Sequence, residues 1–309
     1  LTETKSANST ADPAFSVRRP FATMQSRKDG GRSMRKGISI WAFPNQEPRD
    51  CFRMAKRFGY EGIELSFDES GPISPRSTET ELMEIRKAAE SHGLCLYSLA
   101  SGLYWSTSLT AEDPAERERA EQLVRNQLDA AAFLGCDTIL ILPGMVSGLG
   151  AAEPVVPYDI VYERAQAALV RLAEYAEKKR VTIGIENVWN KFLLSPMEMR
   201  DFIDRVNSRW VAAYFDVGNV VRDGYPEQWI RILGHRIAKV HFKDYKRAIG
   251  TINGFVELLA GDVDFAAVIR ALREIGYDGW ITAEVFPSNS DFEAFLRKTS
   301  EVMDDILQK

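Results

Sequence analysis

Eight short apolar runs, separated by longer helical patterns, constrain the fold of this chain more than any other feature of its sequence. The runs cover residues 37–41, 62–65, 94–99, 138–142, 181–186, 212–216, 238–242 and 280–285. Strands that alternate with helices form βαβ units and a parallel sheet. Eight such units in 309 residues predict a single (β/α)8 TIM barrel. An open doubly wound sheet is the alternative, but no glycine-rich nucleotide-binding fingerprint follows any run, which disfavours it.

The segments between the runs carry signals that begin and end helices. Residues 113–116 and 195–198 each combine an N-cap residue, a proline and a glutamate, which predicts two capping boxes. Apolar residues within 265–275 share one helical face, and Gly276 follows as a stop signal. Gly59, Gly93 and Gly135 close similar patterns shortly before the next apolar run.

The first 35 residues lack this alternation. They are polar and without periodicity, which predicts a flexible tail over residues 1–35 and a catalytic barrel domain over 36–309. Arg18 and Arg19 form a twin-arginine pair, but no apolar segment follows them, so we do not predict an export signal. The tail is alternatively sequence upstream of a true start at Met34.

Charge and composition exclude two classes of partner. The net charge of -5 disfavours nucleic acid, which binds basic surfaces. No apolar run approaches the roughly 20 residues that a membrane-spanning helix needs. The three cysteines, Cys51, Cys95 and Cys136, lie far apart, which is typical of reduced thiols in a cytoplasmic protein.

Polar side chains stand at the ends of four consecutive runs. They are Glu186, Asp216, His241 and Glu284. Active sites of TIM barrels lie at the carboxyl ends of the strands. Side chains alternate along a strand, and in all four runs the neighbouring apolar residues take the outward positions. We therefore expect the four polar side chains to point toward the barrel axis.

A set of one imidazole and three carboxylates predicts a metal site. Three converging carboxylates repel one another unless a cation lies between them. The set is hard and rich in oxygen, so it suits Mn²⁺, Mg²⁺ or Co²⁺ better than Zn²⁺. The alternative is that each residue pairs separately with a lysine or arginine. We predict one divalent ion bound by all four residues.

Other inward or strand-end residues are weaker candidates. Glu64 ends its run on the inward side and is expected either beside a metal ligand or paired with Lys239. Four aromatic residues follow strand ends and are equally consistent with an apolar wall of the site or with plain core: Trp41, Tyr104, Trp105 and Trp189.

Several motifs together resemble one known family. The stretches "GIENVWN", "YFDVGN", "VHFKDYKR", "GDVDFAAVIRALREIGYDGW" and "TAE" are similar to the sugar phosphate isomerase/epimerase branch of the xylose isomerase-like barrel superfamily. The resemblance covers nearly all of residues 36–307. It implies a divalent metal, usually Mn²⁺, at the four strand-end residues, with Glu186 and Glu284 as the acid/base pair. It also implies a small sugar or sugar phosphate as the substrate and a dimer or tetramer as the assembly.

The resemblance extends to expected substrate contacts. Arg247 lies six residues after His241 and matches an arginine that binds substrate oxygens in ketose 3-epimerases. Asn219 stands where free-sugar epimerases carry a histidine, and Phe192 where they tend to carry a carboxylate. The "DVGN" pattern that contains Asn219 also occurs in members that resemble L-ribulose/L-xylulose-5-phosphate 3-epimerase. Both differences argue against a free ketose as the substrate. Lys243, Trp189, Glu64 and Trp105 complete the expected contacts.

The resulting hypothesis is C3 epimerisation of a ketose or ketose phosphate through a metal-stabilised enediolate. The same residues can support an aldose–ketose isomerase or an inosose-type dehydratase of a keto-polyol. A barrel that binds sugar without catalysis is the remaining alternative. The DNA-repair endonuclease IV branch of the superfamily needs several strand-end histidines, and only His241 occupies such a position.

Overall fold

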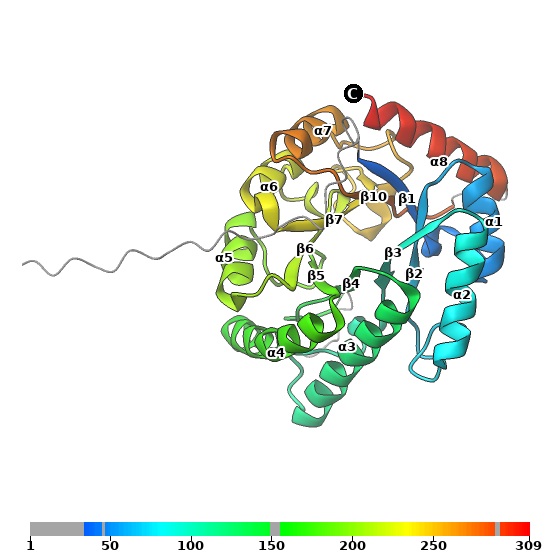
Figure 1. The fold of residues 1–309 in the computed structure, drawn as a ribbon. Helices are drawn as coiled ribbons and strands as arrows, with labels where there is room; N and C mark the ends of the chain where they lie inside the picture. Colours follow the sequence, from blue (N-terminus) through cyan, green and yellow to red (C-terminus); the bar gives the residue numbers. More distant parts are fainter. Residues whose placement is uncertain (1–33, 45–46, 149–154, 288–290) are drawn as a thin grey trace, which may run out of the picture. The chain divides into compact units, whose positions relative to one another are not determined.

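Eight parallel strands close into a barrel, as the sequence predicts. The computed structural model describes residues 34–44, 47–148, 155–287 and 291–309. The strands follow the order β1-β10-β7-β6-β5-β4-β3-β2, and β1 pairs with both β10 and β2 (Figure 1). They are β1 (Arg35–Ser39), β2 (Gly62–Ser66), β3 (Cys95–Ala100), β4 (Thr138–Ile141), β5 (Thr182–Glu186), β6 (Val211–Asp216), β7 (Ile237–Phe242) and β10 (Trp280–Ala283).

Helices surround the barrel (Figure 1). They are α1 (Pro48–Arg57), α2 (Glu79–Ser91), α3 (Pro114–Leu134), α4 (Tyr158–Lys179), α5 (Pro196–Val206), α6 (Pro226–Leu233), α7 (Phe265–Glu274) and α8 (Phe292–Leu307). The main hydrophobic core joins outward strand residues such as Ile183 and Ile185 to the inner faces of these helices. Burial of both strand faces explains why the strands read as apolar runs.

The helix signals are partly confirmed. In both predicted capping boxes, 113–116 and 195–198, the cap side chain accepts a backbone amide, whereas the glutamate carboxylate bonds elsewhere. The reciprocal box forms instead at 78–81. Gly135 and Gly276 adopt φ of 81° and 71° just past helix ends, a backbone conformation that favours glycine.

The first strand begins at Arg35, the last residue that the sequence analysis assigned to the tail. The Arg35 amide donates to the Gly279 carbonyl at 2.9 Å, and its guanidinium lies 3.8 Å from the centroid of the Trp280 ring. Met34 is buried in the core. These contacts place residues 34 and 35 in the barrel, and the rest of the predicted tail lies outside the described residues.

A pair of aromatic rings fills the amino-terminal end of the barrel interior. Tyr97 stacks on Trp280 with ring centroids 4.0 Å apart, and its hydroxyl pairs with Thr282 Oγ1 at 2.8 Å. A Cβ atom at Gly62 would lie 2.6 Å from the Trp280 ring, and one at Gly37 would clash with Tyr97. Only glycine leaves room for the two rings at these positions.

Short elements follow the carboxyl ends of the strands. They are the 3₁₀ turns η1 (Ile40–Ala42), η2 (Leu103–Trp105), η3 (Gly218–Val220) and η5 (Ile252–Gly254), and the hairpin of β8 (Asp244–Tyr245) with β9 (Phe255–Val256). A further 3₁₀ turn, η4 (Gly234–Arg236), instead joins α6 to the beginning of β7. Asp244 fixes this hairpin, because its carboxylate accepts the backbone amides of Tyr245, Gly261 and Val263.

Cys51, Cys95 and Cys136 form no disulfide bonds among the described residues, as expected from their spacing. Cys51 and Cys136 are buried, and burial raises the pKa of Cys51 to about 12, so this thiol stays protonated. Within the part of the chain that the structure describes, no helix combines the length and the apolar character that a membrane span requires.

Candidate metal centre

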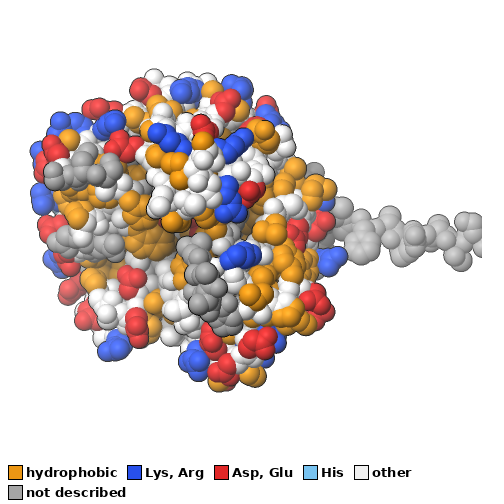
Figure 2. Space-filling view, turned by 180° about the vertical axis from the view of Figure 1, so that it is seen from behind, with side chains coloured by type: hydrophobic (Ala, Val, Ile, Leu, Met, Phe, Trp, Pro, Cys, Tyr) orange, Lys and Arg blue, Asp and Glu red, His pale blue; other side chains and the backbone are white. Residues whose placement is uncertain are grey.

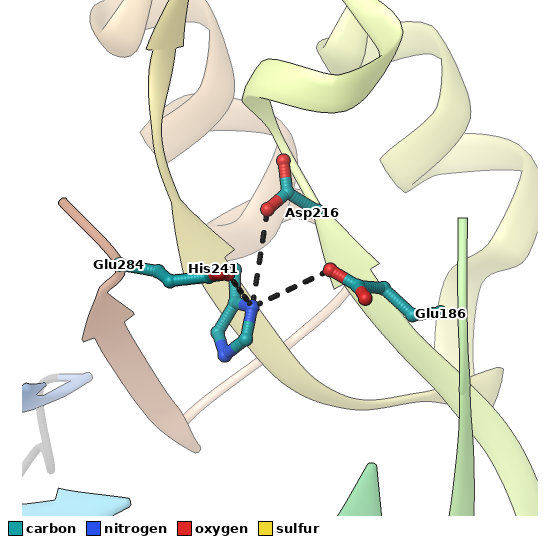
Figure 3. A group of neighbouring side chains, drawn as sticks. All are labelled: Glu186, Asp216, His241 and Glu284. Carbon is teal, nitrogen blue, oxygen red and sulfur yellow. Dashed lines mark ion pairs between the residues drawn. The ribbon is translucent and has the colours of Figure 1, made fainter. Parts of the chain in front are cut away.

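Three adjacent strands and the residue after β10 bring four polar side chains together. Glu186 and Asp216 end β5 and β6, His241 lies on β7, and Glu284 follows β10. One donor atom of each residue lies within 4.8 Å of the other three, and all four residues are buried. Figure 3 shows the three carboxylates grouped around the His241 ring. The structure therefore brings together the four residues that the sequence analysis selected.

The donor atoms of this cluster lie close together in the barrel interior. His241 Nδ1 lies 2.6 Å from Glu284 Oε2, 3.6 Å from Glu186 Oε1 and 3.8 Å from Asp216 Oδ2. His241 Nδ1, Asp216 Oδ2 and Glu284 Oε2 are nevertheless buried without a hydrogen-bond partner. A buried polar atom left in this way costs about 1–3 kcal/mol. A divalent cation among these atoms would remove that cost, so the donor set fits a metal ion.

Glu64 fixes the orientation of the His241 ring. Its Oε1 lies 3.0 Å from His241 Nε2, and its Oε2 accepts hydrogen bonds from Ser98 Oγ at 2.9 Å and from the Tyr214 hydroxyl. A proton on Nε2 that points at Glu64 leaves the Nδ1 lone pair directed into the cluster. Carboxylates commonly hold metal-binding histidines in this way.

Asn187 holds the backbone of Asp216 in place. Its side chain accepts the Asp216 amide and donates to the Asp216 carbonyl, both at 2.8 Å. The backbone amide of Asn219 donates to Asp216 Oδ1 at 2.7 Å, which leaves Oδ2 to face the cluster. The sequence analysis assigned no role to Asn187. The sequence feature that could have identified Asn187 is an amide side chain directly after the strand-end carboxylate Glu186.

The charges of the cluster separate the pKa values of its acids. Burial raises the pKa of Glu186 to about 7. Burial would also raise the pKa of Glu284, but Lys243 and His241 outweigh it and lower the pKa to about 2. Burial opposes a charge on His241, yet Glu64 and Glu284 raise its pKa well above the usual value. Without a metal ion, the neighbouring carboxylates therefore favour the protonated His241 ring, and burial favours the protonated form of Glu186.

These pKa values predict that metal affinity rises with pH. Metal binding must displace the proton on His241 Nδ1 and the proton on the Glu186 carboxyl group, because only deprotonated groups bind a metal ion. We expect the affinity for Mn²⁺ to increase between pH 6 and 8, by about tenfold per pH unit for each proton released. Calorimetric titrations in buffers of different ionisation enthalpy measure the released protons. Glu186→Gln should reduce the slope, whereas an affinity independent of pH would contradict the assigned protonation states.

Comparison with known proteins places the chain in a family. The sequence model of the xylose isomerase-like TIM barrel family matches residues 52–305. The chain belongs to the xylose isomerase-like TIM barrel family. It is 29% identical over 253 residues to an L-ribulose 3-epimerase of Methylomonas sp. (strain DH-1), which covers 78% of this chain and 79% of the relative. This membership confirms the resemblance inferred from the motifs.

Two further matches agree with that placement. A Haemophilus influenzae protein named for L-ribulose-5-phosphate 3-epimerase activity is 23% identical over 270 residues, 82% of this chain and 90% of the relative. The structure of D-psicose 3-epimerase with D-tagatose from Clostridium cellulolyticum H10 has a TM-score of 0.74 at 17% identity. That match covers 88% of this chain and 98% of the other, and it shows the same fold.

In this xylose isomerase-like barrel, a cavity of about 510 Å³ opens beside the cluster. Its polar lining includes Glu186, Glu284, Asn219 and Lys243. Much of its remaining wall is aromatic, from Trp41, Trp105, Trp189, Phe255 and Phe286. On the face drawn in Figure 2, hydrophobic side chains border a hollow near the middle. A second cavity of about 430 Å³ shares Trp189 and Asn219 with the first.

Four of the expected substrate contacts line this cavity, and Glu64 does not. Trp105, Trp189, Asn219 and Lys243 belong to its wall. Glu64 is completely buried and bonded to His241, so it orients this ring instead of contacting substrate. Its alternative partner Lys239 binds Asp137 at 2.6 Å. Tyr104 is core, with its hydroxyl bonded to Gln127.

The structure also places Arg247 outside the cavity wall. Its guanidinium donates to the Gly224 carbonyl at 3.0 Å and lies 5.0 Å from the centroid of the Tyr225 ring. Its backbone amide donates to Asp262 Oδ2 at 2.7 Å. In this arrangement Arg247 is not among the residues that line the cavity beside the cluster, and its contact with substrate stays a prediction from the family resemblance.

Asn219 and Phe192, the two residues that differ from the free-sugar enzymes, lie in different surroundings. Asn219 Nδ2 lies 3.4 Å from Glu186 Oε1, so this residue contacts the cluster directly. Phe192 is buried among Tyr158, Tyr162 and Phe202 and offers no polar group to a substrate.

Proposed function

We propose that this chain is a metal-dependent sugar epimerase that inverts C3 of a ketose or ketose phosphate through an enediolate. One observation carries the proposal: two glutamates from different strands, Glu186 and Glu284, meet at a predicted metal site and line the same cavity. Proton removal and return on opposite faces of one carbon require two such groups. The relative named L-ribulose 3-epimerase supports this reaction class.

The four clustered residues would hold the ion, Mn²⁺ in our proposal. When bound, a divalent ion supplies Lewis-acid stabilisation of negative charge on substrate oxygens. Glu64 keeps His241 Nδ1 directed at the cluster, and Asn187 keeps Asp216 in place. These hydrogen bonds preorganise the ligands, so that little rearrangement is needed during turnover.

Glu186 and Glu284 would perform the proton transfers. One carboxylate takes the C3 proton, and the other returns a proton to the opposite face of the carbon. Their environments differ, with the pKa of Glu186 raised to about 7 and that of Glu284 lowered to about 2. In the metal-free site Glu186 is thus the easier of the two to protonate. The reaction in either direction needs one protonated and one ionised member of the pair.

The aromatic wall would shield the reacting carbon. Trp41, Trp105 and Phe255 surround the polar end of the cavity with apolar surface. Exclusion of water strengthens the electrostatic interactions within a site and protects a reactive enediolate. The same rings offer flat apolar surfaces to the C–H faces of a sugar.

Deuterium exchange tests the proposal. The purified protein, loaded with Mn²⁺, is incubated in D₂O with a panel of ketoses and ketose 5- and 6-phosphates, and the products are read by NMR. We expect deuterium at C3 together with the C3 epimer of one substrate class. Protein stripped with a chelator should give no exchange until Mn²⁺ is restored.

The position of the label separates the alternatives. Deuterium at C1 or C2 with an aldose product would replace epimerisation by aldose–ketose isomerisation. Loss of water from an inosose would identify a dehydratase. Absence of exchange on every sugar, with a divalent ion tightly bound, would contradict the proposed mechanism and favour a barrel that binds sugar without catalysis.

A further inference from the structure

Lys243 places a buried ammonium directly against the metal-binding carboxylates. It follows β7 on the same inward parity as His241. Its Nζ lies 2.9 Å from Glu284 Oε2 and 3.2 Å from Asp216 Oδ2, and only 14% of its side chain is exposed. The ammonium is thus a cation within the group of oxygens that would bind the ion.

The contacted oxygens are not satisfied by this lysine. Asp216 Oδ2 and Glu284 Oε2 are close enough to Nζ for ion pairs, yet both lack a hydrogen bond of acceptable geometry. Lys243 therefore neutralises charge without completing the coordination of either oxygen. A divalent ion at the cluster needs these two oxygens, so the ammonium and the ion use the same ligands.

The surrounding backbone is shaped to admit Lys243. A Cβ atom at Gly218 would lie 2.5 Å from Lys243 Cβ and 3.0 Å from its carbonyl carbon. Gly218, the glycine of the "DVGN" motif, thus permits the close approach of its backbone to the backbone at Lys243. On the other side, Nζ lies 5.6 Å from the centroid of the Phe255 ring, and Lys243 lines the cavity. The flexible side chain consequently has two environments within reach, the carboxylates and the cavity.

We propose that Lys243 and the divalent ion compete for Asp216 and Glu284. The ammonium stabilises the carboxylates when the ion is absent. Binding of the ion repels it toward the cavity, where it donates a hydrogen bond to a substrate oxygen. Lys243 thereby lowers the affinity of the site for metal and contributes a catalytic contact once metal is bound. This second role rests on the proposed sugar epimerase function.

Replacement of the ammonium tests the competition directly. Calorimetric titration of chelator-treated Lys243→Met with Mn²⁺ should give an affinity about tenfold tighter than that of the natural chain, because the competing charge is gone. Lys243→Arg keeps a cation and should retain an affinity close to the natural one. Lys246→Met removes an exposed lysine of the same segment and controls for the change in net charge. Circular dichroism establishes that each variant is folded.

The activity of the same variants provides the second readout. Lys243→Met should lower kcat/KM for the sugar found in the exchange experiment, although it binds Mn²⁺ more tightly. These opposite changes are not expected from general damage to the site. Equal or weaker Mn²⁺ binding by Lys243→Met would overturn the proposed competition. Failure of the natural chain to bind Mn²⁺ would instead refute the metal site itself, and the absence of any sugar exchange would refute the proposed function alone.

Discussion

Glu186→Gln is expected to lower kcat by about 10²- to 10⁴-fold at saturating Mn²⁺. The amide preserves the size of the side chain and one coordinating oxygen, but it cannot accept or return the substrate proton. Glu186 is buried and lines the cavity at the end of β5. The loss should therefore appear in kcat and be smaller in KM.

The measurement compares turnover and deuterium exchange for this variant with those of the natural chain. Glu163→Gln, an identical change at an exposed position of α4, is the control and should retain full turnover. Bound Mn²⁺ is quantified in each sample, so that loss of metal is distinguished from loss of proton transfer. Full turnover of Glu186→Gln with metal bound would remove Glu186 from the acid/base pair.

Glu64→Ala is expected to destabilise the fold by about 3–5 kcal/mol, because it leaves one member of a buried charged pair without its partner. The Glu64 carboxylate bonds His241, Ser98 and Tyr214 inside the barrel, and its own exposure is zero. Its removal also frees the His241 ring to rotate. We therefore expect about 10- to 100-fold weaker binding of Mn²⁺.

Urea unfolding followed by tryptophan fluorescence, in the presence of a chelator, measures the stability separately from the metal. Glu69→Ala removes an exposed carboxylate just beyond β2 and should change stability little. If Glu64→Ala unfolds at the same urea concentration as the natural chain, the hydrogen bonds of Glu64 contribute less to the free energy of unfolding than we expect. If it also binds Mn²⁺ normally, Glu64 does not orient His241.

Alternation along strands explains why the cluster could be predicted from the sequence. Glu186, Asp216, His241 and Glu284 stand at or near the carboxyl ends of neighbouring strands, and the outward residues beside them are apolar. Once eight strands are identified, the barrel leaves little choice about where these side chains point. The strand bounds needed only small adjustments, such as the start of β1 at Arg35.

Contacts across the barrel could not be predicted in the same way. Glu64 and His241 lie 177 positions apart, on strands that do not pair, so no local pattern links them. A shift in register between Ile63 and Glu64 also alters the alignment of β2 with β3. The inward direction of Glu64 was predictable, whereas its partner was not.

Loop conformation limited the prediction for Arg247. The spacing from His241 agrees with the family pattern, but the direction of the side chain depends on the hairpin of β8 and β9. Asp244 and Asp262 accept backbone amides there and set the path of the chain. Such bonds between side chains and loop backbone have no periodic signature in the sequence.

The stacked pair of Tyr97 and Trp280 has a kinetic consequence. These rings fill the barrel interior on the side opposite the carboxyl ends of the strands. The four-residue cluster is therefore reached through the cavity at those carboxyl ends. In the proposed epimerase, substrate and product would then enter and leave through the same cavity, one after the other. A departing product molecule blocks the next arrival, and accumulating product should act as a competitive inhibitor well before the reaction reaches equilibrium.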